Sequence, residues 1–196
     1  YSARFVSGGL YNIDTAGRNV TFATALTSGS LTKIGNGTLA LSAATTYNGD
    51  TIVGRGALVT TTASSGDGNY TVTNGAMLDV QVGAAGAQLQ VNALTLGGGA
   101  SDTATLLVDT LATGNPTAAP VNVAGITTVG TVSIGLSGTA LAASTFPLVS
   151  YGGPSPSGTL QFIPPAGFTG SLSDNHAGLI SVTLVANSAP TTNASI

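Results

Sequence analysis

The chain has 196 residues, enough for one domain with a substantial core, and it contains no cysteine, so disulfides and thiol chemistry are excluded. Charged residues make up 6% of the chain, and four Lys or Arg against seven acidic residues give a net charge of −3. Four scattered cations do not form a nucleic-acid interface, and the apolar runs are too short for a membrane-spanning helix, so neither partner is expected.

Apolar residues alternate with small polar ones throughout the chain, and good helix formers are scarce. The alternating stretches are short and are bounded by Gly, Asn, Asp or Pro, as strands between tight turns are. Clear examples are 38–41, 94–96, 132–134 and 181–184. The sequence therefore predicts an all-β fold with almost no helix.

Residues 1–28 are expected to form two or three strands that cap one end of the molecule or make a contact surface. Four of the ten aromatic residues lie in the first 22 positions. The predicted partner contact lies at the start of this segment and comprises Tyr1, Arg4, Phe5 and Val6. Because the chain begins with Tyr and not Met, it is interpreted as an exported protein whose leader has been removed, or as a trimmed piece.

A repeat of nineteen residues organises positions 29–82. Three turn glycines have this spacing, with an aliphatic residue three positions before each and an apolar residue two positions after. A period near twenty residues made of short strands is typical of a solenoid, in which each coil is completed by its neighbours. The residues assigned to the repeat are Gly37, Gly56 and Gly75, then Ile34, Val53 and Val72, then Leu39, Leu58 and Met77.

The narrow interior of such a coil is expected to exclude large side chains, because each would meet its counterparts above and below. In the third coil the alternation runs better through Leu78, Val80 and Val82 than through Met77 and Asp79. A one-residue slip or bulge is therefore expected there, since it keeps the Asp79 carboxylate out of the core.

The motifs in 31–42, 46–53 and 56–59 resemble the autotransporter-associated β-strand repeat, whose pattern is L-x-K-x-G-x-G-x-L-x-L-S, then T-Y-x-G-x-T-x-V, then G-x-L. The resemblance covers about thirty residues, with a degenerate coil beyond. It implies a right-handed parallel β-helix, or β-solenoid, in a secreted or surface-displayed bacterial protein.

The last third resembles the C-terminal ends of large repeat-bearing surface proteins of planctomycete and verrucomicrobial relatives, on the stretches 146–153 and 165–172. This resemblance implies a terminal cap. The loop 113–120 is interpreted as an excursion from a coil. The predicted organisation is a cap or contact segment at 1–28, a β-solenoid at 29–185 whose C-terminal cap starts near 140, and a polar tail at 186–196.

Residues able to support chemistry are few. His176 lies in a turn near Asp174, where an exposed turn histidine is a simpler interpretation than a general base. Asp50 and Asn69 occupy equivalent corners of neighbouring coils beside Asp67, so paired carboxylates or a Ca²⁺ site is an alternative to ordinary turn chemistry. The other acids considered are Asp79, Asp102 and Asp109. No catalytic residue, metal site or cofactor is predicted.

The favoured hypothesis is a non-enzymatic structural subunit of a bacterial extracellular filament or stalk that self-associates head to tail through its solenoid ends. A second hypothesis is an adhesin module that presents its turns and the loop 113–120 to a glycan or host surface. A third is a polysaccharide lyase or hydrolase built on a β-helix, which would need clustered acids such as Asp50 and Asp67.

Overall fold

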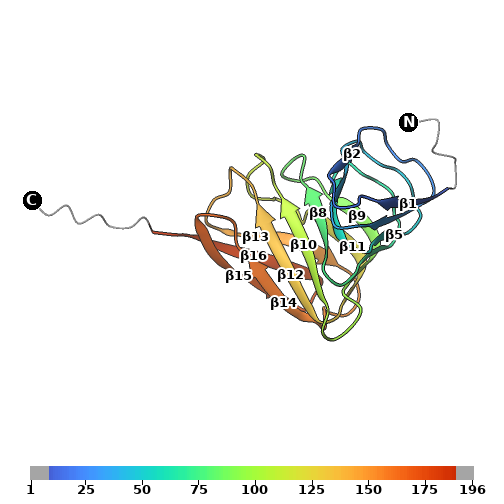
Figure 1. Ribbon diagram of the computed structural model, residues 1–196. Helices are drawn as coiled ribbons and strands as arrows, with labels where there is room; N and C mark the ends of the chain where they lie inside the picture. The colour runs from blue at the N-terminus through green and yellow to red at the C-terminus, as the bar shows by residue number, and fades with distance from the viewer. Residues whose placement is uncertain (1–8, 189–196) are drawn as a thin grey trace, which may run out of the picture.

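The computed structural model describes residues 9–188, and in this range it contains sixteen strands and no helix (Figure 1). No helix of the described residues is therefore long and apolar enough to cross a membrane. In chain order the strands are β1 (Leu10–Asp14), β2 (Val20–Phe22), β3 (Ser30–Ile34), β4 (Thr38–Leu41), β5 (Thr51–Val53), β6 (Gly56–Thr61), β7 (Tyr70–Val72), β8 (Ala76–Gln81), β9 (Leu89–Leu96), β10 (Thr103–Asp109), β11 (Val121–Thr128), β12 (Thr131–Ser137), β13 (Thr145–Tyr151), β14 (Thr159–Ile163), β15 (Phe168–Asp174) and β16 (Leu179–Ala186).

From β1 to β14 successive strands alternate between two sheets, which is the arrangement of a parallel β-helix. One sheet has nine strands in the order β1-β3-β5-β7-β9-β11-β13-β16-β15, and the other has seven in the order β14-β12-β10-β8-β6-β4-β2. Every pair is parallel except the two that involve β16. Each coil contributes one strand to each sheet and bonds to the coils before and after it, so the predicted β-solenoid is confirmed.

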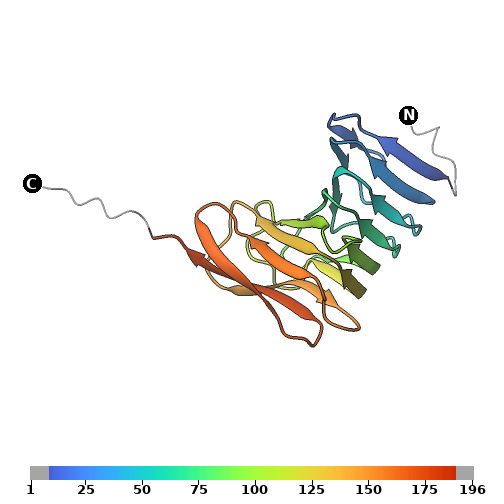
Figure 2. The same ribbon diagram turned by 60° about the horizontal axis from the view of Figure 1, so that its bottom comes forward.

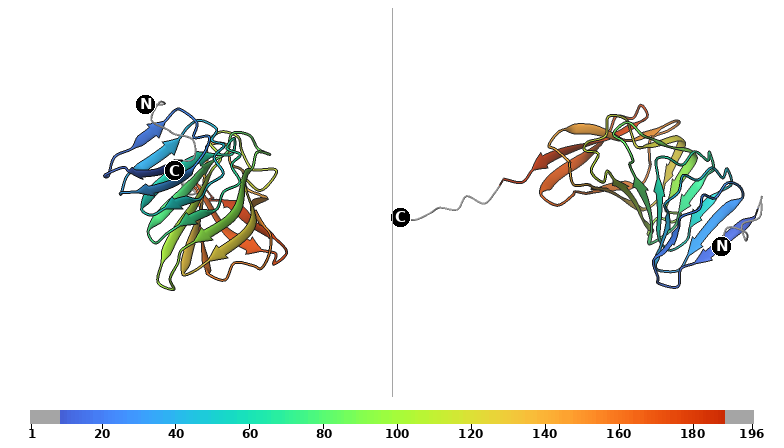
Figure 3. Two further views of the ribbon diagram at one scale, coloured as in Figure 1. Left: turned by 90° about the vertical axis from the view of Figure 1, so that its right-hand side faces the viewer. Right: turned by 90° about the horizontal axis from the view of Figure 1, so that it is seen from above.

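The coils lengthen along the chain. Val20 pairs with Leu39, nineteen residues on, whereas Thr103 pairs with Thr131 and Thr131 with Thr159, twenty-eight residues on each time. The later strands are also longer (Figure 2). The stack follows an arc from the narrow N-terminal coils to the wide C-terminal ones, as the right-hand view of Figure 3 shows.

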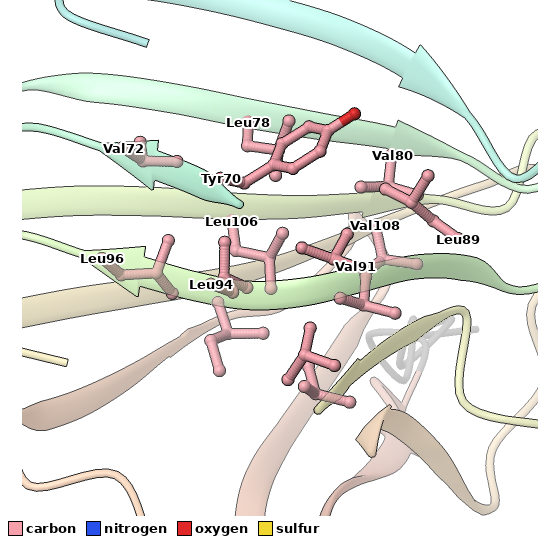
Figure 4. Packing of buried hydrophobic residues seen from close by; sticks show 14 of the residues in the cluster. Tyr70, Val72, Leu78, Val80, Leu89, Val91, Leu94, Leu96, Leu106 and Val108 are labelled. Atoms are coloured by element: carbon pink, nitrogen blue, oxygen red, sulfur yellow. The ribbon is translucent and has the colours of Figure 1, made fainter. Parts of the chain in front are cut away.

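The core is a set of ladders in which inward side chains stack between the two sheets (Figure 4). In the seven-stranded sheet one ladder runs through five consecutive coils, and each member is at most 1% exposed. Burial of a Leu or Ile side chain contributes roughly 1.5–3 kcal/mol, so these ladders are the main source of stability. The ladder comprises Leu39, Leu58, Leu78, Leu106 and Ile134.

The assignment of Ile34 to the core is wrong. The residue that aligns with Val53, and through it with Val72, is Lys33. Ile34 points outward and is 43% exposed, while Lys33 is fully buried. The reason is that the turn between β3 and β4 holds one residue more than the turn between β5 and β6, so counting back from Gly37 finds the wrong face.

Met77 is also misassigned, because Leu58 aligns with Leu78 and not with Met77. Gly75 is shifted by the same step, since Gly56 pairs with Ala76. This is the one-residue slip expected from the alternation, and it places Asp79 on the outer face of β8. Gly56 has φ of +67°, and a side chain there would also meet the backbone of the preceding coil.

The buried Lys33 side chain forms hydrogen bonds with three successive coils at one corner of the solenoid. Its ammonium donates to Oγ1 of Thr15 in the first coil at 2.9 Å and to the carbonyls of Ile34 and Gly35 in its own coil at 3.1 and 2.7 Å. A fourth contact reaches the carbonyl of Arg55 in the next coil at 2.9 Å. The Lys33 ammonium therefore has oxygen partners in three successive coils, which compensate part of the cost of its burial.

Two tyrosines also lie inside the narrow coils, contrary to the expectation that large side chains are excluded. Tyr47 is 2% exposed and Tyr70 is 3% exposed. Tyr70 fits because Thr51, the residue below it in the same ladder, is small. The Tyr47 hydroxyl lies 2.6 Å from the Thr51 hydroxyl, so the polar end of this ring is satisfied within the core.

Parallel coil geometry extends beyond the segment expected as solenoid. β1 pairs with β3 and β2 with β4, so residues 10–22 already form a coil. At the other end β13 and β14 still pair in parallel with the preceding coil. The cap therefore consists of the antiparallel hairpin of β15 and β16.

Candidate functional site

The histidine lies in a hydrogen-bonded cluster where the terminal hairpin meets β13. The Tyr151 hydroxyl donates to Oδ1 of Asp174 at 2.5 Å and also lies 3.1 Å from the Ser155 hydroxyl. Ser155 Oγ is 3.0 Å from Nδ1 of His176, and Oδ2 of Asp174 is 3.3 Å from the same nitrogen. The structure thus brings together a serine, a histidine and an aspartate.

The cluster does not have the geometry of a nucleophilic triad, in which the serine and the carboxylate contact opposite ring nitrogens. Here both contact Nδ1, so the imidazole cannot pass a proton between them. The His176 side chain is 79% exposed, and its backbone is held at φ +54° by a bond from its N–H to Asp174. These contacts close the turn and fasten the hairpin to Tyr151.

The electrostatics of the cluster agree with a structural role. Burial alone would raise the pKa of the Asp174 carboxyl, but hydrogen bonds from Tyr151 and from the His176 N–H outweigh burial and hold that pKa below its usual value. Burial, with the neighbouring carboxylate, raises the pKa of the Tyr151 hydroxyl. Near neutral pH the carboxylate is therefore charged and the phenol is its donor.

Asp50 and Asn69 stack at an outer corner, as the sequence indicates. Asn69 Nδ2 donates to Oδ1 of Asp50 at 2.9 Å, and the next coil continues the ladder because Asn92 Nδ2 donates to Oδ1 of Asn69 at 2.8 Å. The amide groups satisfy one another along the stack. Asp67 does not join this ladder but lines a shallow cleft beside Asn92.

A second amide ladder, which sequence reasoning missed, includes Gln90 and Asn122 from the lining of that cleft. Asn122 Nδ2 donates to Oε1 of Gln90 at 2.7 Å, and the Ser150 hydroxyl donates to Oδ1 of Asn122 at 2.8 Å. The coils here are longer, and Gln90 and Asn122 are thirty-two residues apart, so the nineteen-residue period gives no signal for their pairing.

The remaining acids are separated from this cleft. Asp79 lies on the outer face of the seven-stranded sheet between Val59 and Leu107. Burial and the nearby charge of Asp109 raise the pKa of the Asp79 carboxyl to about 6, and one of its oxygens has no hydrogen-bond partner. Asp102 accepts bonds from two backbone N–H groups in its own turn. In residues 9–188 no group of three or more His, Cys, Asp or Glu is placed to hold a metal ion.

The two ends of the solenoid differ in how they are finished. The predicted contact residues Tyr1, Arg4, Phe5 and Val6 lie outside the described residues. Within the described part, β1 and β2 have no strand on their outer edges. At the C-terminal end β15 is the outermost strand of the nine-stranded sheet, and Gly170 on it lies against the Phe162 ring of β14.

Comparison of the chain with protein-family models, curated proteins and solved structures gives no match.

Proposed function

We propose that the chain is a structural subunit or segment of a bacterial extracellular filament or stalk, joined head to tail through its solenoid ends. The observation that carries this proposal is the unpaired edge at each end of the described solenoid. An exposed edge presents a row of backbone N–H and C=O groups that another strand can satisfy. The resemblance to surface-protein repeats supports the secreted, cell-surface location.

The construction of the molecule suits a load-bearing element. Sheets of nine and seven strands run along its length, and the side chains stacked between them form one continuous apolar core. Each coil is held by its neighbours, so stability grows with the number of coils joined. An additional copy at one end would extend the same hydrogen-bond and packing pattern.

The test is the state of the purified chain of 196 residues over a range of concentrations. We expect negative-stain electron microscopy to show unbranched filaments about one subunit wide, and light scattering to show a mass that rises with concentration. A single monomeric species at all concentrations, including the highest that is soluble, would refute the proposal.

The polar cleft favours one alternative, an adhesin module that binds glycan. Its amide and carboxylate side chains include Gln90, Asn92, Asn122 and Asp67, which are the donors and acceptors that sugar hydroxyls require. Glycan-array binding by monomeric protein, abolished by Asn122→Ala, would support this function over assembly. Loss of binding without loss of folding would have to be shown by circular dichroism.

A further inference from the structure

The two outermost strands of the nine-stranded sheet, β1 and β15, run in the same direction. All the coil strands of the nine-stranded sheet run parallel from β1 to β13. β16 then runs antiparallel to β13, and β15 runs antiparallel to β16, so β15 has the same direction as β1. The two reversals cancel. The sheet therefore begins and ends with strands of one direction at opposite ends of the molecule (Figure 1).

We infer that the joint between subunits is a parallel pairing of β15 of one copy with β1 of the next, so that the nine-stranded sheet runs through the filament. This inference rests on the proposed function and names its contact. This pairing joins only the nine-stranded sheet, because β1 and β15 are the outer strands of that sheet.

Neither edge carries the features that keep natural edge strands apart. Such edges commonly use Lys, Pro, bulges or inward charges. The sequences of β1 (LYNID) and β15 (FTGSLSD) contain no Lys, Arg or Pro, and each has one Asp at its final position. Leu10, at the start of β1, is 78% exposed. Both edge strands thus lack Lys, Arg and Pro, and each has a charged residue only at its last position.

Among the described residues, the apolar side chains at the same two ends are less buried than those between them. The inward residues of β1 and β2 are only partly buried, as are those of β14 and β15, whereas the ladders between them are closed. Stacking one end on the other would cover both sets with apolar surface. These residues include Ile13 and Val20 at the N-terminal end, and Leu160, Phe162, Phe168 and Leu172 at the C-terminal end.

The backbone of β1 shows which groups face the joint. Gly9 O accepts from the Ser30 N–H, and the Thr15 N–H donates to Ile34 O, so odd-numbered residues bond toward β3. In a parallel strand, successive residues direct their N–H and C=O to opposite sides. The N–H of Asn12 therefore points to the edge of β1 that no strand of residues 9–188 covers, and its side chain lies on the exposed outer face.

Asn12→Pro removes that N–H and adds a ring at the edge without touching a bond to β3. We expect this variant to keep the wild-type circular dichroism and thermal midpoint and to need about tenfold more protein before filaments appear. Asn12→Thr is the matched control because it keeps the N–H, and it should assemble like the wild type. Wild-type assembly by Asn12→Pro would overturn the β15–β1 joint and leave filament formation, and thus the proposed function, intact.

A cross-link gives a readout that does not depend on lost assembly. Neighbouring strands are about 4.8 Å apart, within disulfide reach, and the chain has no cysteine of its own. We expect oxidised protein carrying both Asn12→Cys and Ser171→Cys, or Asn12→Cys and Thr169→Cys, to give a ladder of multimers on a non-reducing gel. Each single-cysteine variant should run as a monomer on the same gel, because it has no second cysteine at the joint. Dimers from Asn12→Cys alone would show symmetric β1–β1 pairing and overturn the inference, as would the absence of a ladder from both double variants in preparations that contain filaments.

Discussion

Replacing the buried lysine tests whether the corner between β3 and β4 depends on its charge. Lys33→Met keeps most of the side-chain volume but removes a donor from the carbonyls of Gly35 and Arg55, which lie 2.7 and 2.9 Å from the ammonium. A buried acceptor that loses its donor costs about 1–3 kcal/mol. The variant no longer has to bury a charge, which offsets part of this loss. We therefore expect the free energy of unfolding to fall by about 2–4 kcal/mol.

The stability difference between wild type and Lys33→Met should also depend on pH, which a difference in packing alone would not. Burial lowers the pKa of the Lys33 ammonium from 10.5, and the charge of Asp14 only partly opposes this. Between the folded and unfolded pKa values the unfolded chain holds the proton and the native chain does not, so native stability rises with pH in that window. The advantage of wild type over Lys33→Met should therefore widen as the pH approaches 10.5.

Urea unfolding followed by far-ultraviolet circular dichroism, at pH 7 and at several values up to 10.5, measures both effects. Lys33→Ala is the companion variant, and its added cavity should cost roughly a further 2 kcal/mol. The reasoning is refuted if Lys33→Met is as stable as wild type at pH 7, because the corner would then need only the volume of the side chain. It is also refuted if the wild-type advantage shrinks with rising pH.

Three further predictions concern other parts of the chain. Asp79→Asn should be more stable than wild type at pH 7 in urea unfolding, and its stability should change less between pH 4 and pH 6. The reason is that the pKa of the Asp79 carboxyl is raised from 3.8 to about 6, so wild type loses stability as the pH rises through that window. Tyr151→Phe should lower the free energy of unfolding by about 1–2 kcal/mol, since it removes the hydrogen bond from the Tyr151 hydroxyl to Asp174. Replacement of the exposed His176 by Ala should change the free energy of unfolding by less than about 0.5 kcal/mol. Equal effects of the two variants would contradict the structural role given to the tyrosine. Deletion of residues 1–6 should reduce filament formation under the electron microscope, and unchanged filaments would refute a role for Tyr1 and its neighbours in the joint.

Sequence reasoning was most successful where the coils are regular. The period of nineteen residues and the alternation in each stretch were enough to predict the solenoid, and the broken alternation near Asp79 was enough to predict the slip. It failed at Ile34 and Met77 because the turns of adjacent coils differ in length by one residue. Counting a fixed number of residues from each turn glycine assumes that these turns have equal length. A charged residue such as Lys33 is assigned outward by any hydropathy pattern, although here backbone oxygens solvate it.

The candidate sites were less accessible to sequence reasoning, because they depend on pairing between distant residues. The corner pair of Asp50 and Asn69 was predicted from the repeat, since both lie in coils of equal length. The ladder from Gln90 to Asn122 lies where the coils lengthen, so no fixed period aligns its members. The contacts of His176 with Ser155 depend on how the terminal hairpin folds back on β13, which no local pattern records.

The two described ends differ, so an end-to-end joint of the kind proposed would bring unlike surfaces together. Within residues 9–188, the N-terminal coil ends in strands of five and three residues, while the C-terminal end has a seven-residue edge strand from an antiparallel hairpin. Contact between unlike surfaces is heterologous, and it gives an open chain unless the rotation closes a ring. Because the subunit follows an arc (Figure 3), successive copies would turn relative to one another. The filament expected from this subunit is therefore polar and helical, and a straight or bipolar fibre would require a different joint from β15 on β1.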